Sequence, residues 1–118
     1  MKETKHLYNN HFGMAFYWKK ENEILMNKVQ LIFRDTGFYF TKHELYLFKE
    51  CVEESIQLNQ CCDECELKNQ CYKYLLKTPC NQIDLVLPME ELHAVKDLID
   101  GTLFKMNLED YLYGEGVN

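Results

Sequence analysis

Glycine is scarce in this chain, and its five glycines among 118 residues are not clustered. A phosphate-binding loop needs several glycines at a strand-to-helix junction, so the sequence excludes a Gly-rich nucleotide cradle. The chain also lacks a Gly-x-Ser-x-Gly elbow. His43-Glu44 opens like the zinc-protease motif His-Glu-x-x-His, but Leu47 replaces the second histidine. We therefore expect a non-enzymatic protein.

Positive charge and long apolar runs are lacking as well. The formal net charge is −6, and no cluster of Lys and Arg interleaved with aromatics offsets it, which argues against a nucleic-acid partner. No window of about 18 apolar residues is present to span a bilayer, and residues 1–10 contain no apolar run of signal-peptide length. We expect a cytoplasmic protein without membrane association, whose thiols are reduced by default.

The chain does contain enough apolar residues, 47% of the total, to bury the core of one domain. We predict a single domain spanning residues 1–118. Its parts are a first half at about 29–59, a cysteine-rich crossover at 60–71, a second half at about 72–101, and a C-terminal helix with tail at 102–118.

The first half is predicted to be a hairpin followed by a helix. Residues 29–34 alternate between apolar and polar, residues 35–37 supply a turn, and residues 38–40 return. Thr41 and Glu44 form a capping box that starts a helix running to about residue 58. The helix should bury one stripe at helical spacing: Leu45, Phe48, Val52 and Ile56.

The second half repeats this pattern. Residues 72–76 and 83–87 alternate around a turn at 78–81, and a helix follows that should bury Leu92, Val95 and Ile99. Gly101 is predicted to end this helix. A separate short helix should then open at Asn107.

The two halves align without a gap at an offset of 47 residues. Residues 38–54 fall on residues 85–101, with Leu45 matching Leu92 and Lys49 matching Lys96. This regularity predicts duplicated strand-strand-helix units, although any two amphipathic segments of this kind look alike. The predicted fold is α+β and two-layered: the units form one antiparallel sheet with two helices on one face, plus the short C-terminal helix.

The other face of that sheet should carry apolar residues. The positions that alternate with the predicted core include Ile32, Tyr39, Leu75 and Val86. A patch of this kind is usually covered, either by another subunit or by another segment of the chain. The internal candidates are residues 12–18, which look like an additional strand, and the C-terminal helix. A homodimer, or a protein partner bound to this aromatic-rich face, is the competing cover.

Cysteine is concentrated in the crossover. Cys61, Cys62, Cys65 and Cys71 lie within eleven positions, Cys80 follows in the second turn, and a sixth cysteine, Cys51, lies in the first helix. Cys51 is predicted to be a small buried residue. A Cys-x-x-Cys pair in a tight turn can place two thiolates on one ion. The candidate metal ligands are Cys62, Cys65, Cys71 and Cys80.

Three interpretations of these thiols remain open: free thiols without a function, a structural zinc or iron-sulfur site, and disulfides. The expected reducing compartment argues against disulfides. The polar neighbours of the crossover cysteines argue against their being core residues. Cys61 could substitute for Cys62, and His6 and His11 are second-rank ligands. Our first hypothesis is a structural metal in the crossover, and the alternative is a metal-free interaction or dimerisation module.

The segments HFGMAFYW, VQLIFRDTGFYFTKHELYLFKECVEE and LLKTPCNQIDLVLPMEELHAVKDLID resemble a family of small uncharacterised bacterial proteins classed as a domain of unknown function. The resemblance covers roughly residues 11–101 and implies the same fold, but no activity. Members of that family carry a Cys-x-x-Cys in the first hairpin, where this chain has Glu23 and Met26. The crossover cysteines would then be an insertion peculiar to this chain.

Overall fold

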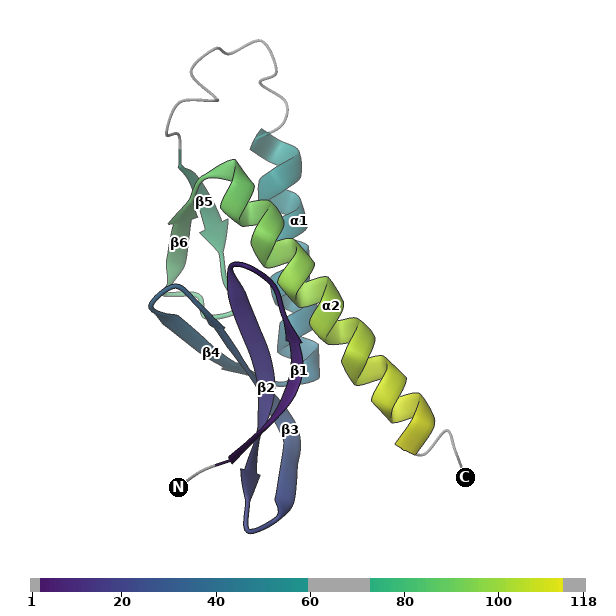
Figure 1. The fold of residues 1–118 in the computed structure, drawn as a ribbon. Helices are drawn as coiled ribbons and strands as arrows, with labels where there is room; N and C mark the ends of the chain where they lie inside the picture. The colour runs from purple at the N-terminus through teal and green to yellow at the C-terminus, as the bar shows by residue number, and fades with distance from the viewer. Residues whose placement is uncertain (1–2, 60–72, 114–118) are drawn as a thin grey trace.

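The computed structural model describes residues 3–59 and 73–113, which form an α+β fold as predicted (Figure 1). The elements are β1 (Glu3–Asn9), β2 (Gly13–Lys20), β3 (Glu23–Phe33), β4 (Thr36–Phe40), α1 (Lys42–Asn59), β5 (Tyr74–Lys77), β6 (Asp84–Leu87) and α2 (Met89–Tyr113). In these described segments, neither α1 nor α2 combines the length and apolar character needed to cross a membrane.

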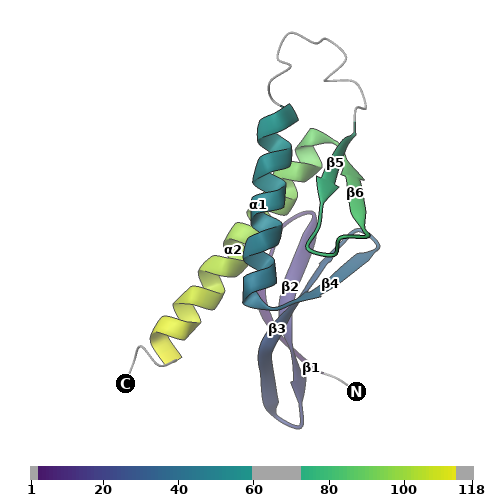
Figure 2. The same ribbon diagram turned by 180° about the vertical axis from the view of Figure 1, so that it is seen from behind.

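The strands form two sheets rather than the single predicted one. β1 to β4 make a four-stranded antiparallel sheet in that order, and β5 pairs only with β6 (Figure 2). The second hairpin does not extend this sheet. β2 pairs with β3 on the side opposite β4, from Gly13 to Lys20, and neither β5 nor β6 pairs with β1, β2, β3 or β4. The hairpin packs on α1 instead, where the Ser55 hydroxyl donates a hydrogen bond of 2.9 Å to the Leu75 carbonyl.

The first hairpin and the start of α1 agree with the prediction. β3 and β4 pair in register around a turn at Arg34 and Asp35, slightly earlier than predicted. The capping box is present: the Thr41 amide donates to Glu44 Oε1 at 2.8 Å, and the Glu44 amide donates to Thr41 Oγ1 at 3.1 Å. These two bonds satisfy amides that the first helical turn leaves without partners.

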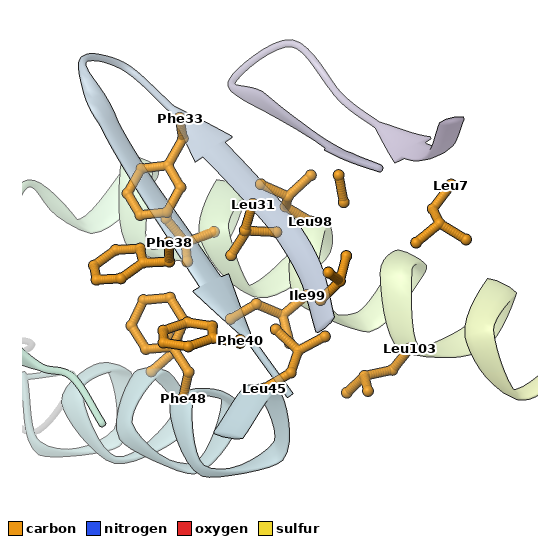
Figure 3. Close-up of a cluster of buried hydrophobic side chains, with 14 of the residues drawn as sticks. Leu7, Leu31, Phe33, Phe38, Phe40, Leu45, Phe48, Leu98, Ile99 and Leu103 are labelled. Atoms are coloured by element: carbon orange, nitrogen blue, oxygen red, sulfur yellow. The ribbon is translucent and has the colours of Figure 1, made fainter. Parts of the chain in front are cut away.

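The core lies between both helices and the inner face of the four-stranded sheet, by which we mean the face turned toward α1 and α2 (Figure 3). The ring of Phe48 on α1 lies 5.4 Å from that of Phe38, 5.6 Å from Phe40 and 6.5 Å from Phe33, between ring centroids. All predicted stripe residues of both helices are buried: Leu45, Phe48, Val52, Ile56, Leu92, Val95 and Ile99.

The N-terminal strand β1, which the sequence did not predict, attaches the sheet to α2. The Tyr8 hydroxyl donates to Asp97 Oδ2 at 2.9 Å, and Asn10 Nδ2 donates to the same oxygen at 3.0 Å. Lys5 Nζ lies 2.8 Å from Glu109 Oε2. The pairing of β1 with β2 shifts between His6 and Tyr8, and this shift lets Tyr8 and the buried Leu7 both reach the helix side.

The predicted end of the second helix at Gly101 and the separate helix from Asn107 are wrong, because α2 runs without a break to Tyr113. Gly101 lies where β1 crosses α2. A Cβ atom at this position would lie 2.4 Å from ring carbons of Tyr8. Glycine is therefore needed for close packing, and its cost to the helix of about 0.5–1 kcal/mol is offset by this contact.

Two ion pairs join α1 to α2, and their residues occupy matching positions in the two halves of the chain. Lys49 Nζ on α1 lies 3.4 Å from Asp100 Oδ1 on α2, and Lys96 Nζ on α2 lies 3.9 Å from Glu53 Oε2 on α1. Lys49 and Lys96 are 47 positions apart, and so are Glu53 and Asp100. Each lysine therefore contacts the acid of the other half.

Gly101→Ala should lower the free energy of unfolding by about 1–2 kcal/mol, because the added methyl group displaces the Tyr8 ring and breaks its bond to Asp97. In a Tyr8→Ala background the same substitution should instead raise stability by about 0.5–1 kcal/mol, the ordinary helix preference for alanine. Urea unfolding of the four proteins measures both effects. The same sign in both backgrounds would contradict this role of Gly101.

Stability at alkaline pH should depend on Tyr17. Burial, together with the nearby carboxylates of Asp110 and Glu109, raises the pKa of Tyr17 from 10.0 to about 12. The unfolded chain ionises first, so the contribution of Tyr17 is complete below pH 10 and is lost as the pH rises from about 10 to 12. Relative to Tyr17→Phe, the free energy of unfolding should fall by about 1 kcal/mol between pH 9 and 11. A constant difference in urea unfolding would contradict the shift.

Candidate interaction surface

Three of the four predicted metal ligands fall outside the described residues: Cys62, Cys65 and Cys71. Cys61, the predicted substitute for Cys62, lies outside them as well. Cys80 is described and lies in the turn between β5 and β6, with an exposed side chain. Thr78 holds this turn, since its hydroxyl lies 2.9 Å from the Cys80 carbonyl and 2.7 Å from that of Ile83. The turn is at the opposite end of the hairpin from Lys73, where the described chain resumes.

Cys51 lies on α1 and is partly buried against the core, so the prediction of a small buried residue is confirmed in part. It lines a shallow groove of about 360 Å³ with Leu58 and Leu75. Burial raises the pKa of the Cys51 thiol, and the carboxylates of Glu54 and Glu50 raise it further. The thiolate needed for nucleophilic or metal chemistry is therefore disfavoured at this position.

The histidines form no metal cluster within the described part of the chain. Across residues 3–59 and 73–113, no three His, Cys, Asp or Glu side chains gather closely enough to hold an ion. His6 and His11 line an open depression of about 510 Å³ beside Arg34, and His6 Nε2 lies 2.8 Å from Asn9 Oδ1. Neither His43 nor His93 lines this depression or the Cys51 groove.

The outer face of the four-stranded sheet is the face turned away from both helices, and it is the candidate interaction surface. Its residues alternate with the buried inner ones along each strand: Met14, Phe16, Trp18, Gln30, Ile32 and Tyr39. Phe16 is only 6% exposed, because Trp18 packs edge-on against it with ring centroids 5.0 Å apart. Tyr39 is 44% exposed. An aromatic surface thus faces solvent on the described chain.

A recess of about 820 Å³ opens in the outer face where the pairing of β2 with β3 is irregular. Phe16 pairs with Gln30, and Trp18 pairs with Leu25. The two steps along β2 from Phe16 to Trp18 therefore lie opposite five steps along β3 from Gln30 to Leu25. The extra residues bend β3 out of register. Trp18, Leu25, Gln30 and Tyr39 line the resulting hollow.

Gln30 fixes the floor of this recess. Its Oε1 accepts a hydrogen bond of 3.0 Å from Trp18 Nε1, and its Nε2 donates one of 3.1 Å to the Phe38 carbonyl. Both polar ends of the amide are therefore used within the sheet. The indole ring is held in place by this bond.

Leu75 and Val86, which the sequence placed on the same face as Ile32 and Tyr39, belong to the other sheet. They face each other in the pairing of β5 with β6 and are 53% and 52% exposed. Leu75 lines the Cys51 groove beside α1 rather than the outer face. The predicted patch is therefore divided between two sheets.

A further exposed apolar stripe lies on the last three turns of α2. Its members follow helical spacing: Phe104, Leu108, Tyr111 and Leu112. Residues 12–18 and this helix were predicted as covers for the outer face, and neither serves as one. Residues 13–20 are β2 within the sheet, and Phe104 and Tyr111 remain 67% and 72% exposed.

Sequence reasoning missed the central residues of the outer face, Trp18, Gln30 and Lys28. A signal was present in GMAFYWKK, where Met14, Phe16 and Trp18 alternate with smaller or inward-facing positions. The role of Gln30 depends on the register between three strands, which local alternation does not specify.

No protein-family model, curated protein or solved structure matches this chain. The resemblance to a family of small bacterial proteins stays a prediction.

Proposed function

We propose that this protein is a non-enzymatic interaction module that forms a homodimer through the outer face of its four-stranded sheet. The observation that carries the proposal is that both helices pack on the inner face, while aromatic and apolar residues of β2, β3 and β4 remain uncovered on the outer one. An exposed patch of this kind favours contact with another protein surface. Tyr and Trp are the side chains that contribute most in such interfaces.

The outer face suits a binding role because its aromatic residues are already ordered. Trp18 is tied to Gln30, and Gln30 is tied to the backbone of β4. Ordering the side chains of an interface is a main cost of association. Because these side chains are already held in place, binding a partner would cost little of this conformational entropy.

Tyr39→Glu should shift the mass measured by light scattering from twice 14.2 kDa toward 14.2 kDa, because it places a charge in the centre of the contact. Tyr111→Glu is the control, since it makes the same exchange at a more exposed tyrosine on α2. A wild-type mass of 14.2 kDa at all concentrations would contradict the homodimer. Dissociation by Tyr111→Glu alone would place the contact on α2.

A second proposed function is a structural zinc or iron-sulfur site formed by Cys62, Cys65, Cys71 and Cys80. The Cys-x-x-Cys pair within a polar segment supports it, and four thiolates are a suitable donor set for zinc. Cys80 contributes an exposed thiol. The hairpin separates Cys80 from Lys73 by the length of β5, about 13 Å, so the crossover would have to reach back along the hairpin.

Elemental analysis of protein purified without oxygen tests the metal site. We expect close to one zinc per chain, or iron with visible cluster absorbance, and a lower melting temperature in Cys65→Ser. Cys51→Ser is the control and should retain the metal, because its thiol lies on α1. Absence of both metals, together with an unchanged melting temperature in Cys65→Ser, would refute the proposal.

We also propose that the two strand-strand-helix halves arose by duplication. The gap-free offset of 47 residues continues along both helices, where Ile56 and Leu103 are buried at matching positions. The reciprocal pairs Lys49–Asp100 and Lys96–Glu53 are what a pseudo-twofold relation between α1 and α2 would produce. The buried hydroxyls of Ser55 and Thr102 also match.

A further inference from the structure

The recess in the outer face has the size and composition of a small-molecule site. Its volume of about 820 Å³ lies within the range of about 300–1,000 Å³ typical of ligand pockets. Its lining combines the rings of Trp18 and Tyr39 and the side chain of Leu25 with one uncharged polar group, Gln30, and with charged side chains. Two aromatic rings beside a fixed amide favour a flat ligand.

Three lysine side chains lie close to this aromatic lining. Lys28 Nζ lies 5.4 Å from the centroid of the Tyr39 ring, and Lys19 and Lys20 line the recess. None of these three ammonium groups takes part in an ion pair with a carboxylate of the described residues.

Two carboxylates also line the recess, Glu3 and Glu21. Glu3 faces Lys19 across β1 and β2, and the two lysines and two carboxylates that line the recess have a net charge of zero. Lys28 is left as the cation nearest the aromatic wall. Its ammonium can pair with an anion held beside the Tyr39 ring.

We propose that the recess binds a flat aromatic molecule that carries a carboxylate, sulfonate or phosphate. The ring lies against Trp18 and Tyr39, and the anionic group lies at Lys28. The inference rests on the proposed function in one respect: it takes the outer face to be the binding face.

The dye anilinonaphthalenesulfonate tests this proposal, because Trp18 is the only tryptophan in the chain. A dye bound in the recess accepts excitation energy from Trp18, so titration should show saturable transfer. Tyr39→Ala and Lys28→Ala should each weaken binding by about fivefold or more, through loss of a ring contact or a cation. Both side chains are exposed, so both variants should fold; circular dichroism checks this.

Two controls make the result specific. Tyr111→Ala removes an exposed tyrosine from the apolar stripe of α2 and should leave the dye affinity unchanged. N-phenylnaphthylamine has the same rings without the sulfonate, and its affinity should not respond to Lys28→Ala. No saturable transfer, or equal weakening by Tyr39→Ala and Tyr111→Ala, would refute the recess as the site. Equal effects of Lys28→Ala on both dyes would refute the anionic ligand.

Light scattering of the same samples separates this inference from the homodimer. A dimer that Tyr39→Glu dissociates, but that shows no energy transfer, retains the proposed function and refutes the ligand site. A chain of 14.2 kDa that binds the dye at Tyr39 and Lys28 retains the ligand site and refutes the homodimer.

Discussion

The packing of Phe48 against the inner face of the sheet is the contact on which the rest of the fold depends. Its ring is completely buried among three phenylalanines of β3 and β4, and it joins α1 to the hairpin that precedes it. A side chain of this size in such a position contributes about 3–5 kcal/mol. α2 then packs on α1 and on β1 and β2, so the two helices together cover the buried residues of the inner face.

This arrangement determines which surface is available. Because the inner face is filled by helices, the apolar residues that alternate with the core ones can only face outward on β2, β3 and β4. On this outer face, Gln30 connects Trp18 to the backbone of β4, and the irregular pairing of β2 with β3 opens the recess between them. The exposure of the outer face is thus a consequence of how the core is built.

The second hairpin shows how a correct local prediction led to a wrong sheet. β5 and β6 lie within the predicted segments, and Leu76 and Leu87 are buried as their alternation indicates. Their sheet partner was wrong because the hairpin packs on α1, where the Ser55 hydroxyl donates to the Leu75 carbonyl, and local alternation does not specify which strands pair. Gly101 was assigned to a helix end for a similar reason: its contact is with Tyr8, which is far away in the sequence.

The sequence by itself determined the α+β class, the first hairpin, the capping box of Thr41 and Glu44, and the buried stripes of both helices. These features depend on periodicity and on neighbours three or four positions away. Only the tertiary structure decided the division into two sheets, the continuity of α2 through Gly101 and the recess at Trp18. Each of these depends on contacts between distant segments, where strand register and close packing, rather than local preference, set the free energy.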